Sequence, residues 1–101
     1  MATFIVLGNW TEQGAKDFAG APARAKANAE AAAAMGGRIV GTYWTLGPYD
    51  FVTIVEAPDD AAMTAGMLIL GAAGNVRTLT MRAFVIEEME AIVAAATSAG
   101  R

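Results

Sequence analysis

The stretch from Tyr43 to Asp60, YWTLGPYDFVTIVEAPDD, predicts one tight hairpin that leads directly into a helix. Two β-rich runs, Arg38 to Thr45 and Asp50 to Glu56, flank the turn residues Leu46 to Tyr49, which predicts a four-residue hairpin loop. Pro58-Asp59-Asp60 then predicts a helix start, because proline suits the first helical turn and carboxylates are favoured at the positive end of the helix dipole.

This hairpin predicts a register and two apolar faces. The register pairs Thr45 with Asp50, Tyr43 with Val52, and Ile39 with Glu56. One face would carry Ile39, Tyr43, Val52 and Ile54, and the other Val40, Trp44, Phe51 and Val55. A sheet that is apolar on both faces needs cover on both. Helices supply one cover, and we expect the sheet of an identical subunit to supply the other.

Upstream of the hairpin, Thr3 to Trp10 has the β-branched, apolar profile of a strand that is buried on both faces. Thr11 is suited to cap a following helix. That helix is expected to break at Gly20-Ala21-Pro22, to resume along an alanine-rich run to Met35, and to end at Gly36-Gly37. The segment therefore predicts one strand followed by an interrupted helix.

Downstream, Met63, Met67 and Leu70 recur at helical spacing and predict the buried face of the second helix. Gly71 to Asn75 predicts a turn, and the alternation in Val76 to Val85 predicts a fourth strand. A last helix from about Glu87 to Ala96 is expected to point Met89, Ile92, Val93 and Ala96 inward.

The resulting order, β-α-β-β-α-β, predicts an α+β fold of the ferredoxin-like type in one domain spanning residues 1–101. Its sheet would be four-stranded and antiparallel with strand order 4-1-3-2, and an extra helix would follow at the C-terminus.

The turn Gly47-Pro48-Tyr49-Asp50 and the later stretch Gly74 to Phe84 together resemble the GYD-domain family, over about Phe4 to Phe84. This resemblance implies a dimeric α/β barrel, and the family has no assigned biochemical role. Leu79 departs from the family pattern, which commonly carries an acidic residue there. The resemblance therefore implies a fold and a self-partner, and it implies no reaction.

Composition limits the classes of partner. The chain is 55% hydrophobic and 17% charged, with a net charge of −3, so more apolar surface is available than one small core needs. Its basic residues are scattered, which argues against nucleic acid. The longest uncharged run, Ala61 to Val76, is too short for a membrane span, and the start of the chain lacks the basic segment of a secretory signal. We therefore expect a cytoplasmic protein.

Cysteine and histidine are both absent from the sequence. Thiolate nucleophiles, thiolate or imidazole metal ligands and histidine acid–base chemistry are therefore excluded. We expect no metal and no cofactor.

Polar and aromatic residues gather at one predicted sheet edge, where the first two strands end and the last two begin. They are Asn9, Trp10, Trp44, Tyr49, Asp50, Asn75 and Arg77. Such a group would suit a small anionic or polar organic ligand. The alternative is that these residues serve as turn, cap and subunit-contact residues, with Asp50 fixing the hairpin through backbone amides.

Four further residues are candidate ligand contacts: Tyr43, Glu56, Arg82 and Arg24. Arg82 would be a barrel-interior anion binder or an ion-pair partner across the dimer. Glu56, on the face of Tyr43, would be a general base if it is desolvated and an ordinary strand-end residue if it is exposed. Arg24 stands where the family pattern has an arginine and would reach toward the sheet end, or lie solvated on its helix.

Three functions fit this sequence. The first is a homo-oligomeric regulatory or small-ligand-binding module without turnover. The second is a cofactor-free oxygenase or isomerase acting on a hydrophobic or aromatic molecule held among Trp44, Phe51, Phe84 and the methionines, with Tyr43, Asp50, Glu56 and Arg82 as its polar groups. The third is a structural assembly unit. A ligand-binding function would need a cavity of roughly 300 Å³ or more.

Overall fold

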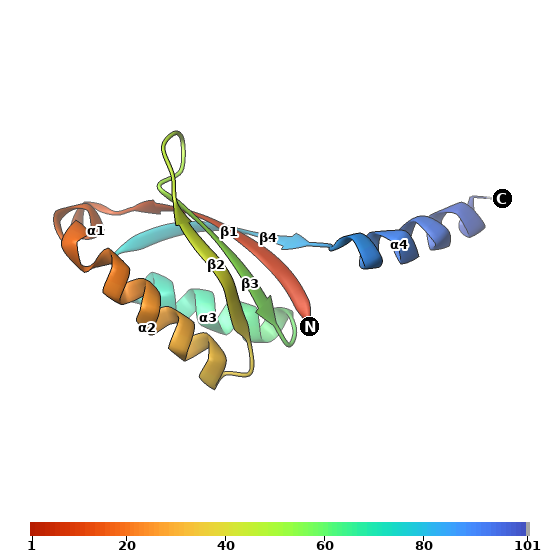
Figure 1. Ribbon diagram of the computed structural model, residues 1–101, viewed down its shortest axis with the longest axis horizontal. Helices are drawn as coiled ribbons and strands as arrows, with labels where there is room; N and C mark the ends of the chain where they lie inside the picture. The colour runs from red at the N-terminus through yellow and green to blue at the C-terminus, as the bar shows by residue number, and fades with distance from the viewer. Residues whose placement is uncertain (101) are drawn as a thin grey trace.

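The structure is a computed structural model that describes residues 1–100 (Figure 1). A strand and a broken helix come first, followed by the hairpin, a second helix, a fourth strand and a last helix. The elements are β1 (Ala2–Trp10), α1 (Glu12–Lys16), the 3₁₀ turn η1 (Phe18–Gly20), α2 (Ala21–Ala34), β2 (Arg38–Trp44), β3 (Phe51–Ala57), α3 (Asp60–Ala73), β4 (Val76–Ala83) and α4 (Ile86–Ala99).

The four strands form one open antiparallel sheet in the order β2-β3-β1-β4. This order confirms the predicted 4-1-3-2 arrangement and the ferredoxin-like α+β fold. Helices α2 and α3 lie on the same side of the sheet, whereas α4 projects away from it (Figure 1). We call the side facing α2 and α3 the covered face and the opposite side the bare face.

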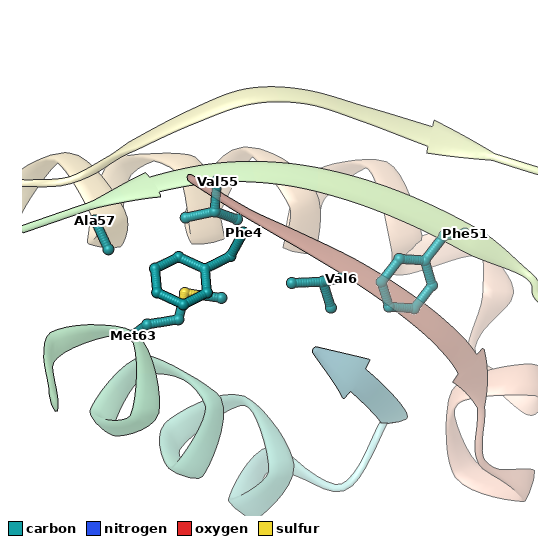
Figure 2. Packing of buried hydrophobic residues seen from close by; sticks show 6 residues of the cluster. All are labelled: Phe4, Val6, Phe51, Val55, Ala57 and Met63. Atoms are coloured by element: carbon teal, nitrogen blue, oxygen red, sulfur yellow. The ribbon is translucent and has the colours of Figure 1, made fainter. Parts of the chain in front are cut away.

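The core lies between the covered face and α3 (Figure 2). Alternate residues of β1 and β3 point into it because side chains along a strand alternate between faces. The buried cluster comprises Phe4, Val6, Phe51, Val55, Ala57 and Met63. Gly8 continues the β1 series, and a Cβ there would meet the Phe51 ring at 2.0 Å, so only glycine leaves room for that ring. The predicted buried face of α3 is confirmed at Met63.

Side-chain caps fix the starts of helices α1 and α3. The Thr11 side chain accepts a hydrogen bond from the Gly14 N–H and caps α1, as predicted. Asp59 caps α3 by accepting from Ala62 N–H at 2.8 Å, so the helix begins at Asp60 and the predicted placement of Pro58 inside its first turn is wrong. Gly74 follows the last residue of α3 as its C-cap, and its φ of +82° favours glycine.

The hairpin register is correct near the turn and wrong at the far end. Tyr43 pairs with Val52 as predicted, but Ile39 pairs with Val55 instead of Glu56, because the register shifts between Ile39 and Gly41. Val40 is thus an extra residue, a β-bulge that moves Ile39 to the covered face. The prediction that Ile39 shares a face with Tyr43 is therefore wrong.

The bare face is apolar at its centre. Cross-strand pairing places the side chains in three rows: Tyr43, Val52, Leu7 and Leu79; Gly41, Ile54, Ile5 and Met81; and Arg38, Glu56, Thr3 and Ala83. Within residues 1–100 no helix lies on this face. The charged side chains of Arg38 and Glu56 lie toward one end of it, and Arg77 lies at the other.

Helix α4 does not pack against its own chain, which makes the predicted inward packing of its apolar residues wrong. None of its residues is buried, and Met89, Ile92 and Val93 are 49%, 40% and 51% exposed. Val85 is extended at its start, and Glu88 accepts from the Val85 N–H at 3.1 Å. The chain therefore continues outward from the end of β4. No helix among residues 1–100 is long and apolar enough to cross a membrane.

Candidate functional site

The sheet edge that the sequence singled out exists, because β1 and β2 end where β3 and β4 begin. Asp50 joins the hairpin loop to β1 at this edge. Its N–H donates to the Gly8 carbonyl at 2.8 Å, and its carboxylate accepts from the Trp10 N–H at 2.9 Å. Thr45 closes the loop, donating to the Tyr49 carbonyl at 2.6 Å. Asp50 therefore organises backbone amides, as the structural interpretation of the motif expected.

Replacing Asp50 by alanine is expected to lower the free energy of unfolding by about 1–3 kcal/mol, because the half-buried Trp10 N–H loses a charged acceptor. Urea unfolding measures the change. Glu30→Ala, on the exposed side of α2, is the control and should leave stability within about 0.5 kcal/mol. Equal unfolding midpoints for the two variants would contradict this role of Asp50.

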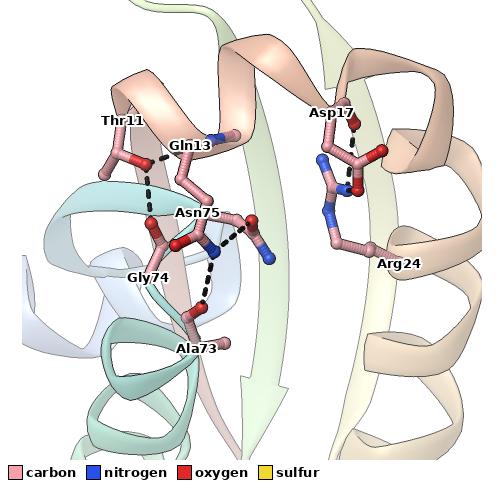
Figure 3. A network of polar contacts seen from close by, with 8 residues as sticks. Thr11, Gln13, Asp17, Arg24, Ala73, Gly74 and Asn75 are labelled. Atoms are coloured by element: carbon pink, nitrogen blue, oxygen red, sulfur yellow. Dashed lines mark hydrogen bonds and ion pairs between the residues drawn. The ribbon is translucent and has the colours of Figure 1, made fainter.

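A second network at the same edge holds α1 against the turn after α3 (Figure 3). The Thr11 hydroxyl donates to the Gly74 carbonyl at 2.6 Å, and the Gln13 amide donates to Asn75 Oδ1 at 3.0 Å and to the Ala73 carbonyl at 3.2 Å. The polar groups of this network are therefore hydrogen-bonded to one another. Asn75 thus serves the fold, which accords with the structural alternative for this residue.

Three predicted ligand contacts lie on the bare face. Tyr43 and Arg77 are exposed there, on the side of the sheet opposite α2 and α3. Glu56 is one-third exposed and accepts from Arg38 Nε at 2.8 Å, so its carboxylate is already ion-paired. The structure therefore does not place Glu56 in the desolvated, unpaired environment that the general-base hypothesis requires.

Arg82 lies on the covered face of β4, opposite Phe4, and not on the face that would line a barrel. Its guanidinium forms an ion pair with Glu88 at 3.5 Å and lies 4.5 Å from the Phe84 ring centroid. A shallow hollow beside it is lined by Thr78, Thr80 and α3 residues. In a single chain, Arg82 thus connects β4 to the first turn of α4.

A cavity of about 370 Å³, which we call the covered cavity, lies between the covered face and helices α2 and α3. At one end it is walled by Trp10, Trp44 and Phe51, with Arg24 entering from the first turn of α2. Its remaining walls are the alanine face of α2 and the methionines and small residues of α3. The volume meets the size that a small-molecule site requires. The structure thus brings Trp44 and Arg24 together and leaves Tyr43, Arg77 and Arg82 outside.

Sequence reasoning missed Asn28, Thr42 and Thr53 as cavity residues. Thr42 and Thr53 lie opposite each other on β2 and β3 and share a hydrogen bond of 3.4 Å. The available signal was the alanine run of α2, since small side chains on a helix leave space above the sheet. Among residues 1–100 no group of three carboxylates, cysteines or histidines could hold a metal ion.

Comparison with known proteins identifies the family of this chain. The family model described as GYD domain matches residues 4–93. The glutamine synthetase and cystathionine beta-lyase binding protein of Thermus thermophilus is 42% identical over 90 residues, which span 88% of this chain and 95% of that protein. A crystal structure of a Thermus thermophilus protein is 30% identical, with a TM-score of 0.50, and the match covers 84% of this chain and 95% of that one. The resemblance found in the hairpin and in β4 is confirmed, and this chain belongs to the GYD-domain family.

Proposed function

We propose that this chain is a homo-oligomeric regulatory module that works in the cytoplasm by binding other proteins, enzymes of amino-acid metabolism among them. The observation that carries the proposal is the amount of large apolar surface that the folded chain leaves uncovered, on the bare face and along α4. Monomeric proteins rarely expose contiguous apolar patches of this kind. Such surface is suited to contacts with other chains.

A second copy is the partner we propose for the bare face. The centre of that face is apolar at Ile5, Leu7, Ile54 and Met81, and the charged pair Arg38–Glu56 lies toward its end. An apolar centre with a polar rim is the usual anatomy of a protein interface. Packing two such faces against each other would produce the dimeric α/β barrel that the family resemblance implies.

The enzyme partners follow from the Thermus thermophilus relative, which is named for binding glutamine synthetase and cystathionine beta-lyase. Identity of 42% over nearly the whole of both chains supports the same class of partner here.

We assign the contact with these enzymes to α4. An isolated 14-residue helix is marginal in water, so its one-sided stripe Ile86, Met89, Val93 and Ala96 supports a helix that is stabilised by another protein. Three glutamates lie in its first turns and it contains no basic residue. The partner that fits is an apolar groove with a basic rim.

Biolayer interferometry with purified glutamine synthetase and cystathionine β-lyase from the encoding organism tests this function. We expect saturable binding to at least one of them. Met89→Glu, which places a charge in the apolar stripe, should weaken that binding at least tenfold, because a buried unpaired carboxylate is costly. Ala94→Glu, which lies outside the stripe, is the matched control. Absence of binding to both enzymes would contradict the proposed function, and equal affinity of the two variants would remove α4 from the contact.

A further inference from the structure

One charged group in the covered cavity lacks a full set of partners. Arg24 Nη1 donates to the Asp17 carboxylate at 2.8 Å and to the Asp17 carbonyl at 3.1 Å. Its other terminal nitrogen, Nη2, is buried and has no hydrogen-bond partner. Figure 3 shows Asp17 meeting only one side of the guanidinium. A buried donor without an acceptor is unfavourable, so a shift of the guanidinium that presented Nη2 to an acceptor of a ligand would be stabilising.

The hydroxyl groups of the lining and its other charged group are already paired. Thr42 and Thr53 bind each other, and Glu56, the other charged residue of the lining, is paired with Arg38. Asp17 is two-thirds exposed, so water screens the charge that it presents to Arg24. Arg24 is therefore the group in this cavity that is best placed to receive an anion.

Aromatic residues of the sheet line the same cavity as this cation. Trp44 pairs with Phe51 across β2 and β3, and Phe51 lies over Gly8, two residues before Trp10 in β1. All three aromatic side chains line the same cavity as Arg24. A flat apolar body would contact these rings while an attached carboxylate accepted from the guanidinium, which is suited to planar anions.

We propose that the covered cavity binds a small aromatic or apolar monocarboxylate, with the Arg24 guanidinium as its counter-ion. This inference goes beyond the proposed protein-binding function. The cavity lies on the opposite side of the sheet from the bare face, so a ligand and a second copy would not compete for one surface. A regulatory module with such a cavity would respond to the concentration of an organic acid.

Tryptophan fluorescence provides a direct test, because both tryptophans of the chain line the cavity. The probes are 3-phenylpropionate and its neutral analogue 3-phenylpropionamide, titrated into the full-length protein. We expect saturable binding of the acid, at least tenfold tighter than that of the amide. Equal affinities would overturn the role of the carboxylate, and no saturation by either probe at millimolar concentration would overturn the site.

A pair of charge variants separates ligand binding from a purely structural role of Arg24. Arg24→Gln should weaken binding of the acid at least tenfold, to the level of the amide. Asp17→Asn breaks the same ion pair but keeps the guanidinium, so it should bind the acid as well as or better than the wild type. An equal loss in both variants would show that Arg24 acts only by holding η1, and would overturn its assignment as the counter-ion.

Two glycines of α3 give a matched test of the location. A Cβ at Gly66 or at Gly71 would meet no atom within 4 Å, but only Gly66 lines the cavity. Gly66→Leu should therefore abolish binding of the acid, while Gly71→Leu should bind it like the wild type. Both variants should remain folded, which circular dichroism checks. Unchanged binding by Gly66→Leu would place the ligand elsewhere and overturn the proposal. None of these outcomes depends on enzyme capture by α4.

Discussion

Replacing Met81 by glutamate is expected to dissociate the homodimer, raising its Kd at least about 100-fold. Met81 lies on the bare face beside Ile5 and is 40% exposed in a single chain, so the new carboxylate would stay hydrated in the monomer. In the dimer it would be removed from water against an apolar sheet, at a cost of roughly 3 kcal/mol or more. Sedimentation velocity over a range of concentrations measures the dissociation.

Leu68→Glu is the control for this substitution. Leu68 is 70% exposed on α3, on the other side of the sheet. The control introduces the same charge and should leave the dimer unchanged. If Met81→Glu sediments as the wild type does, the bare face is not the dimer interface. If both variants become monomers, the dimer depends on another surface or on net charge.

Gly14→Ala is expected to produce the largest loss of stability among single-methyl changes, about 3 kcal/mol. A Cβ at Gly14 would lie 2.0 Å from the carbonyl oxygen of Asn75 and 2.9 Å from its carbonyl carbon. Backbone atoms cannot rotate aside as a flexible side chain does, so α1 must move off the turn it contacts. That movement would also break the Thr11–Gly74 hydrogen bond. Thermal and urea unfolding measure the loss.

Gly71→Ala provides the comparison, because the added methyl there meets no atom within 4 Å. Alanine is the better helix former, so this variant should be stabilised by roughly 0.5–1 kcal/mol. The two substitutions are chemically identical and differ only in the space around the Cβ. A Gly14→Ala protein as stable as the Gly71→Ala protein would show that α1 does not contact the Asn75 backbone closely.

Most of the fold follows from local signals that act within a few residues. Thr11 as a cap, the Gly47-Pro48 hairpin turn and the alternation in β4 each depend on neighbours in the chain, and each prediction is confirmed. The bulge at Val40 was missed because Ile39 and Val40 are both apolar. A run without alternation does not reveal where the pairing gains one residue.

The packing of α4 and the choice of the covered face are harder to predict from the sequence, because both depend on contacts between distant segments. The apolar stripe of α4 correctly predicts an amphipathic helix, but it does not say which chain covers the stripe. Likewise, the alternation of β4 groups Arg82 with Thr78 and Thr80, as observed, but does not decide which face the helices cover. That choice determines whether Arg82 faces a barrel.

The candidate site was predicted only in part for the same reason. Of the predicted ligand contacts, Trp44 and Arg24 line the cavity, whereas Tyr43 and Arg77 belong to the bare face or its end. Glu56 borders the cavity, but its carboxylate is paired with Arg38. From the sequence alone, the alanine run of α2 indicates helix propensity. The space that these small side chains leave over the sheet depends on the separation of α2 from α3. Helix propensity gives no information about that separation.

Native mass spectrometry of the purified chain, alone and mixed with glutamine synthetase and with cystathionine β-lyase, tests the central claim most directly. We expect the chain alone at twice its mass of 10.4 kDa or a higher even multiple. We also expect at least one enzyme to gain mass in steps of that oligomer. A chain observed only at 10.4 kDa, with neither enzyme changed in mass, would contradict a homo-oligomeric module that regulates enzymes by binding them.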